Sequence, residues 1–166
     1  FSSLYGFSQL YINQNNLKSL KNLINSIDSS NITYLNLKIN KIETIDVRFP
    51  VSLISLFMDK NLLTSIEEEN FQNLTKLDSL SLRSNQIRTI HSSAFFGLYN
   101  LTLLDVSFNL IETIEASYFR DTGKLFYLYM YSNKIKIVRE NAFVSLVNLE
   151  YLNLYNNKRR VIKEKM

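Results

Sequence analysis

Side chains that could carry out catalysis are sparse in this chain. It contains no cysteine, which removes disulfide and thiol chemistry, and its single histidine, His91, cannot form a histidine cluster. The three glycines, Gly6, Gly97 and Gly123, lie too far apart for a phosphate-binding loop. The acidic run at residues 67–69 suits a solvated turn at the start of a short helical segment. We therefore expect no catalytic residues, no metal ligands and no cofactor.

Tyrosine is the residue type that could supply binding chemistry. Tyr127, Tyr129 and Tyr131 occupy alternate positions, and residues two apart point to the same side of a strand. A tyrosine offers a large contact area, few rotatable bonds and a hydroxyl that gives direction. Whether these rings face a partner or a core depends on the segments that position them.

The formal charge of +4 is concentrated at the C-terminal end. Residues 158–166 hold five of the 19 basic and one of the 15 acidic residues, which leaves 14 of each sign in residues 1–157. A basic tail of this kind is usually solvated, with a phosphate or lipid contact as the alternative. We expect no nucleic-acid partner for the neutral body. A membrane span is not expected either, because no window approaches ~18 consecutive apolar residues.

A repeat of about 24 residues organises the chain. It is marked by Asn15, Asn40, Asn61, Asn85, Asn109, Asn133 and Asn157. Apolar residues stand eight, five and three positions before each asparagine and five positions after it. The copies therefore follow L-x-x-L-x-L-x-x-N-x-L-x-x-L, where L is any apolar residue, and the one departure is Arg159, two positions after Asn157.

Each repeat predicts one short strand of a parallel sheet. In "LLDVSFN", Leu104 and Val106 face one side, while Leu103, Asp105 and Ser107 face the other. One such strand cannot bury its apolar side alone, so stacked copies must share a core with the returning segments. We expect the repeated asparagine to turn inward and bond backbone groups of its own bend and of the next coil.

A phenylalanine recurs ten positions after the asparagine in four successive repeats. These residues are Phe71, Phe95, Phe119 and Phe143. Stacked one per coil, they predict an aromatic spine on the convex side. Asn25 and Pro50 occupy this position in the first two repeats, and the repeat around "DVRFPVS" has only 21 residues, so local irregularity is expected there.

This pattern resembles the leucine-rich repeat family over almost the whole chain, in the 24-residue, phenylalanine-containing form of extracellular members such as Toll-type receptors and insect recognition proteins. The resemblance implies an α/β solenoid, a horseshoe with a concave parallel sheet and convex turns or short helices. We expect one domain of about seven repeats over residues 1–157, and a basic tail or incomplete last repeat over residues 158–166. Because the repeat is already under way at residue 7, we expect a fragment of a longer array.

The outward strand positions form the predicted binding surface. We expect Tyr127, Tyr129, Tyr131, Tyr151 and Tyr155 to make one patch, with Phe57, Arg83 and Asp105 further along the same face. The plainer interpretation of the tyrosines is that they suit strands. The charged residues can either pair with one another or select a partner's charges, and both interpretations stay open.

The resemblance implies protein recognition outside the cell or at its surface, in innate immunity or adhesion, through a protein ligand or co-receptor. An intracellular scaffold or regulatory subunit and a self-associating module, such as a homodimer, are the alternatives. Three N-x-[ST] sequences, at Asn31, Asn73 and Asn100, predict N-glycosylation. All three lie outside the outward strand positions, so glycans would leave the concave face open.

Overall fold

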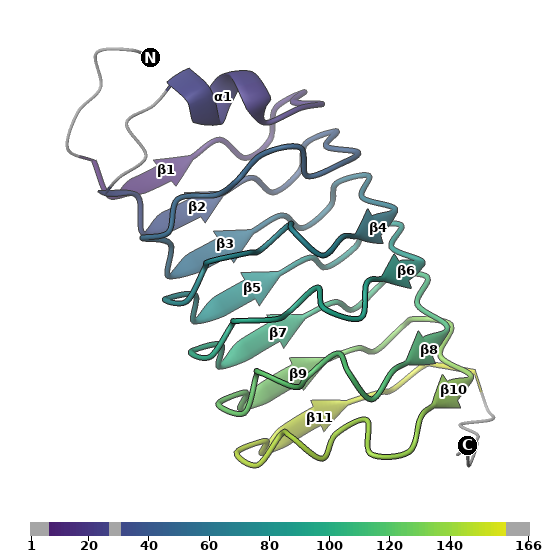
Figure 1. Ribbon diagram of the computed structural model, residues 1–166. Coiled ribbons are helices and arrows are strands. Elements are labelled where there is room, and N and C mark those ends of the chain that lie inside the picture. Colours follow the sequence, from purple (N-terminus) through teal and green to yellow (C-terminus); the bar gives the residue numbers. More distant parts are fainter. Residues whose placement is uncertain (1–6, 27–30, 159–166) are drawn as a thin grey trace.

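The repeats build a seven-stranded parallel sheet, which runs along the length of the molecule (Figure 1). The computed structural model describes residues 7–26 and 31–158. Ile162, the apolar residue five positions after Asn157, and most of the basic tail lie outside the described residues. The strands, in spatial order, are β1 (Gln9–Tyr11), β2 (Tyr34–Asn36), β3 (Ser55–Phe57), β5 (Ser79–Ser81), β7 (Leu103–Asp105), β9 (Tyr127–Tyr129) and β11 (Tyr151–Asn153). The predicted solenoid is confirmed.

Equivalent positions of successive repeats pair in register. Leu104 of β7 pairs with Leu80 of β5 and with Leu128 of β9, and Asp105 pairs with Tyr129 in the same way. The sheet therefore carries straight columns of side chains, and alternate columns face the core and solvent. The residues that point outward from this sheet form the concave face.

The returning segments contain little regular structure. They hold one short helix among the described residues, α1 (Lys21–Ser26), and two pairs of two-residue strands. The pairs are β4 (Ser65–Ile66) with β6 (Thr89–Ile90), and β8 (Thr113–Ile114) with β10 (Ile137–Val138). Turns make up most of the convex side, so each coil is short and its strand stays close to the next.

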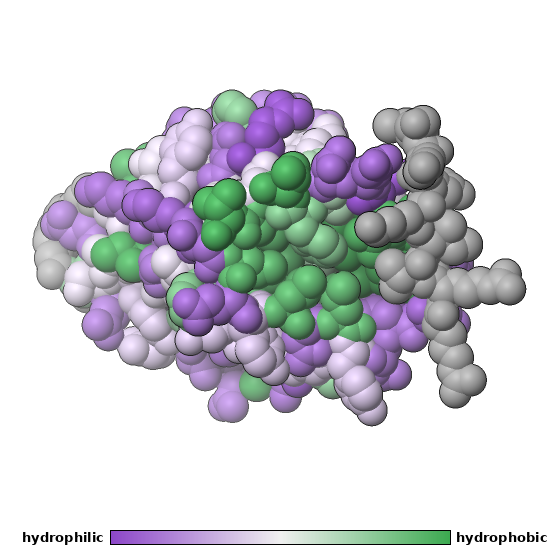
Figure 2. Space-filling view, turned by 90° about the horizontal axis from the view of Figure 1, so that it is seen from below, coloured by the Kyte–Doolittle hydropathy of each residue, from purple (hydrophilic) through white to green (hydrophobic). Residues whose placement is uncertain are grey.

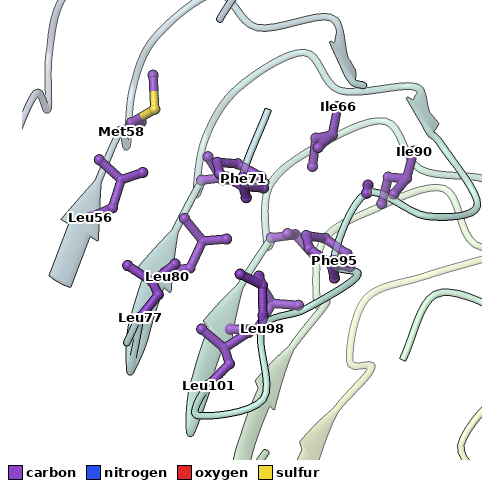
Figure 3. Close-up of a cluster of buried hydrophobic side chains, with 14 of the residues drawn as sticks. Leu56, Met58, Ile66, Phe71, Leu77, Leu80, Ile90, Phe95, Leu98 and Leu101 are labelled. Atoms are coloured by element: carbon purple, nitrogen blue, oxygen red, sulfur yellow. The ribbon is translucent and has the colours of Figure 1, made fainter. Parts of the chain in front are cut away.

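The core lies between the sheet and the returning segments. Leu56 and Leu80 point from the strands toward Phe71 and Phe95, as Figure 3 shows. The phenylalanine rings stack one per coil, with centroids 6.4 Å apart between Phe71 and Phe95 and 6.0 Å apart between Phe119 and Phe143. The predicted spine is confirmed.

The spine begins one coil earlier than the sequence indicated. Phe49, not Pro50, supplies the ring, which stacks on Phe71 with centroids 6.5 Å apart and planes inclined by 12°. In the repeat of 21 residues, the returning segment is shorter, so the chain reaches the stack nine residues after Asn40 instead of ten. Counting ten residues from the asparagine therefore selected the wrong residue, Pro50, at this repeat.

The repeated asparagines turn inward as predicted and form a ladder, but each from Asn40 onward bonds its own bend and the preceding coil, not the next one. Asn109 donates through Nδ2 to the carbonyl oxygens of Leu82 and Val106, both at 3.0 Å. Its Oδ1 accepts from the backbone N–H of Ile87 at 3.0 Å. One side chain thus satisfies backbone groups of two coils that the buried bend would otherwise leave unpaired.

The residue before each repeated asparagine has a left-handed backbone conformation. The residues are Gln14, Ile39, Lys60, Ser84, Phe108, Ser132 and Asn156, with φ between 54° and 59°. The N–H groups of the first six reach a carbonyl of the next coil, as Phe108 does to Tyr131 O at 3.0 Å. The fold imposes this conformation in every coil, whatever residue stands there.

The last described coil of the solenoid shows how much a neighbouring coil contributes to the burial of a strand leucine. Leu152 of β11 is 40% exposed, whereas the equivalent Leu128 of β9 is fully buried. Seen from this end, hydrophobic side chains gather across the surface (Figure 2). A strand leucine is therefore buried only when a coil is stacked on each side of it.

Candidate binding surface on the concave face

Four tyrosines at the C-terminal end of the concave face form one cluster. Tyr127, Tyr129, Tyr131 and Tyr151 make up this C-terminal aromatic cluster. Tyr129 is central, with its ring centroid 6.3 Å from Tyr127, 6.5 Å from Tyr131 and 5.3 Å from Tyr151. Burial, followed by the neighbouring tyrosines, raises the pKa of Tyr129 from its ordinary value. Its phenol, like that of any neutral tyrosine, can both donate and accept a hydrogen bond.

Tyr155 does not join these rings. It is 79% exposed, and among the described residues its ring packs against no other aromatic ring. The position lies two residues beyond the end of β11, which belongs to the last coil of the described residues. The structure thus brings together four of the five tyrosines that the sequence grouped.

A second aromatic group lies at the other end of the same face. Tyr11, Tyr34 and Phe57 form this N-terminal aromatic cluster, with ring centroids 5.0 Å apart for the first pair and 5.3 Å for the second. The ammonium of Lys38 lies over Phe57, 4.7 Å from its centroid. Sequence reasoning selected Phe57 but missed the other two, because the three rings meet diagonally across different columns.

Residues without aromatic rings separate the two clusters along the sheet. Between them run β5 and β7, where Ser79, Ser81 and Leu103 face outward. Ser81 is almost fully buried, and its hydroxyl donates to Asp59 Oδ1 at 2.7 Å. On β5 and β7 the outward strand positions therefore carry no aromatic ring, in contrast to the two ends of the face.

The charged residues of the concave face pair with one another. Lys38 Nζ lies 3.3 Å from Asp59 Oδ2, and Arg83 Nη1 lies 4.0 Å from Asp105 Oδ2. Asp59 is 7% exposed, and its Oδ2 has the ion pair but no hydrogen bond among the described residues. Of the two interpretations that the sequence left open, the structure favours internal pairing.

Arg83 is held more firmly than a surface arginine. Its guanidinium carbon lies 4.4 Å from the ring centroid of Phe108 and 5.1 Å from that of Tyr131. It also donates to the hydroxyls of Ser107 and Tyr131. Sequence reasoning did not select Phe108 as a surface residue. Phe108 has the left-handed conformation of the residue before the repeated asparagine, so it lies outside the alternating positions of the strand.

The other candidate groups remain isolated. His91 is exposed and accepts a local hydrogen bond from the N–H of Ser93. Within residues 7–26 and 31–158 there is no group of three or more side chains that could hold a metal ion. In the same part of the chain, no helix has the length and apolar character needed to cross a membrane.

The three sequon asparagines are exposed and lie away from the strands of the sheet. Asn100 donates through Nδ2 to the carbonyl of Thr75 at 2.7 Å and accepts at Oδ1 from Lys124 at 2.7 Å. Asn73 adopts a left-handed conformation, with φ of 67°.

Taken together, the in-register sheet, the asparagine ladder and the phenylalanine stack define a repeat solenoid whose outward columns are free to vary. The chain belongs to the leucine-rich repeat family: a family model described as "Leucine rich repeat" matches residues 51–111 and 99–158.

Two relatives place the chain within this family. It is 31% identical to rat (Rattus norvegicus) lumican over 86 residues, which covers 48% of this chain and 24% of lumican. It is 29% identical to a chain in the crystal structure of a TLR13–ssRNA13 complex, with a TM-score of 0.74 over 90% of this chain and 21% of that chain. The chain thus spans a quarter or less of each relative.

Proposed function

We propose that this protein is a non-enzymatic recognition module that binds a protein partner through its concave face. The observation that carries the proposal is the C-terminal aromatic cluster, in which four tyrosines present rings and hydroxyls on an outward sheet face. Tyrosine-rich clusters of this kind supply the energetic centre of many protein interfaces. Phe57, Arg83 and Asp105 extend the surface toward the N-terminal end, and Tyr155 marks its rim.

A protein partner suits this face better than a nucleic acid does. The similar chain of known structure is in a complex with an RNA, ssRNA13. Binding to a phosphate backbone needs several cations that are free to contact it. Lys38 and Arg83 are instead engaged with Asp59 and Asp105.

We place the protein outside the cell or at its surface. Similarity to lumican and to TLR13 supports this placement, as do the three exposed sequons. We propose that at least one of Asn31, Asn73 and Asn100 carries a glycan. Protein from a secretory host should lose mass on treatment with a glycosidase, and an unchanged mass would remove this support.

Affinity capture tests the proposed function. The folded protein is immobilised and exposed to proteins from extracellular fluid, in parallel with a Tyr129→Ser/Tyr151→Ser variant and with Tyr99→Ser. Tyr99 is an exposed tyrosine outside the sheet, so its variant controls for the loss of a phenol. A partner retained by the wild type and the control but lost by the double variant supports the proposal. Equal capture by all three proteins would refute it.

Self-association is tested with the same variants. If a second copy occupies the face, the mass in solution should rise with concentration for the wild type and for Tyr99→Ser. The Tyr129→Ser/Tyr151→Ser variant should then remain monomeric. That result would show that the surface binds a second copy of this chain and not a different protein.

A further inference from the structure

The concave face carries two separate aromatic clusters. The N-terminal aromatic cluster lies on β1, β2 and β3, and the C-terminal aromatic cluster belongs to β9, β11 and the residue that follows β9 by two positions. Ser79, Ser81 and Leu103 lie between them on β5 and β7. A partner that contacts both clusters must therefore cross β5 and β7.

The charges of this face balance. The outward strand columns, including the positions two residues after each strand, contain Lys38, Asp59, Arg83 and Asp105 as their charged residues. These four make two ion pairs, and both cations also lie over aromatic rings. A charged group on the partner would find these four charges already paired with one another, so contact with them would compensate little of its lost hydration.

The distance between the two clusters determines how long a partner segment must be to reach both. Three strand steps lead from β3 through β5 and β7 to β9. At ~4.8 Å per step, the clusters lie roughly 14 Å apart. An extended chain advances roughly 3.3 to 3.6 Å per residue, so about four residues cover this distance. Side chains at i and i+4 of an extended segment point to the same side, so both can face the sheet.

We propose that the concave face takes an uncharged, extended segment of a protein partner, which crosses the strands from β3 to β9 and places one large apolar side chain in each aromatic cluster. The proposal rests on the proposed function and adds the chemistry and spacing of the partner. Phe57 on β3, at the inner edge of its cluster, receives one side chain, and Tyr129 on β9, at the inner edge of the other cluster, receives the second. The phenols at the edges of the clusters offer hydrogen bonds to the backbone of the segment.

Selection from random peptides tests the proposal. A phage-displayed library of peptides about 12 residues long is selected on the immobilised folded protein, and enriched peptides are synthesised. We expect two aromatic or large aliphatic residues at i and i+4 and no net charge in the part between them. Affinity should change little between about 0.05 M and about 0.5 M salt, because no ion pair forms with the face. Charged peptides with strongly salt-dependent binding would overturn the proposal.

Two variants of the same protein separate this proposal from the proposed function. Tyr34→Ser/Phe57→Ser removes the N-terminal aromatic cluster, and Tyr129→Ser/Tyr151→Ser removes most of the C-terminal one. Each should weaken an enriched peptide by about tenfold or more, whereas Tyr99→Ser should leave its affinity unchanged. If only the C-terminal pair matters, the two-cluster proposal fails while the proposed function stands. If neither pair matters, both fail.

Discussion

The ring of Phe108 packs edge-on against the ring of Tyr131, with centroids 5.3 Å apart, and Arg83 lies against both. Phe108 reaches this position from a left-handed backbone conformation, with φ of 54°. An arginine held by two rings, a carboxylate and two hydroxyls has little rotamer freedom left to lose on binding. The middle of the concave face is thus pre-organised before any partner arrives.

A double-mutant cycle measures this arrangement. Arg83→Met and Phe108→Ser are made singly and together, and the free energy of unfolding is obtained from urea denaturation. We expect a coupling energy of about 0.5 to 1 kcal/mol, the size of a partly exposed cation–π contact. Additive effects of the two substitutions would show that the ring does not hold the guanidinium.

The asparagine ladder predicts a larger effect on stability. Asn109→Leu removes the donors to Leu82 O and Val106 O and the acceptor for Ile87 N–H, all inside the core. The free energy of unfolding should fall by roughly 1 to 3 kcal/mol. Asn16→Leu, at an exposed position, is the matched control and should change stability by less than about 0.5 kcal/mol. Unchanged thermal unfolding of Asn109→Leu would argue against a structural ladder.

Much of the fold could be predicted because the repeat samples each position seven times. Leu104 and Val106 were assigned to the core from their columns, and Asn109 from its recurrence, because every copy faces the same packing problem. Phe49 escaped this reasoning because a change in repeat length breaks a fixed offset.

The binding surface was less predictable for a physical reason. Periodicity identifies which side chains share a column, but contacts on a sheet surface also run diagonally and depend on side-chain reach. The sequence therefore grouped Tyr127 with Tyr129, yet missed the contacts of Tyr11 with Tyr34. Phe108 lay outside the alternation because its backbone turns away from the strand.

Ile39 offers a test of backbone strain. It is a β-branched residue at φ of 55°, and its side chain is 41% exposed, so its packing offsets little of the strain. Ile39→Asn should raise the free energy of unfolding by about 0.5 to 1.5 kcal/mol, because asparagine tolerates the left-handed region. Ile54→Asn replaces a similarly exposed isoleucine without positive φ and should give no gain. Equal effects of the two substitutions would contradict strain at Ile39.

Tyr118 predicts a loss of stability in alkali. Burial, with a smaller contribution from Glu115, raises the pKa of Tyr118 from 10.0 to about 12. The unfolded chain therefore releases this proton first, and stability should fall as the pH rises from about 10 to about 12, by about 2 kcal/mol. Below about pH 9 the group should have no such effect.

Tyr118→Phe isolates this contribution. The difference in unfolding free energy between wild type and variant, followed as a function of pH, removes the parallel contributions of other tyrosines such as Tyr34 and Tyr129, whose pKa values are also raised. A difference that stays constant above about pH 10 would show that the phenol does not titrate as its burial requires.

The central claim is that the concave face binds a protein through its tyrosines, and its most direct measurement is the affinity of a captured partner for three forms of the folded protein. The wild type and Tyr99→Ser should bind with the same affinity, and Tyr129→Ser/Tyr151→Ser should bind at least about tenfold more weakly. Equal affinity for all three forms would contradict the claim.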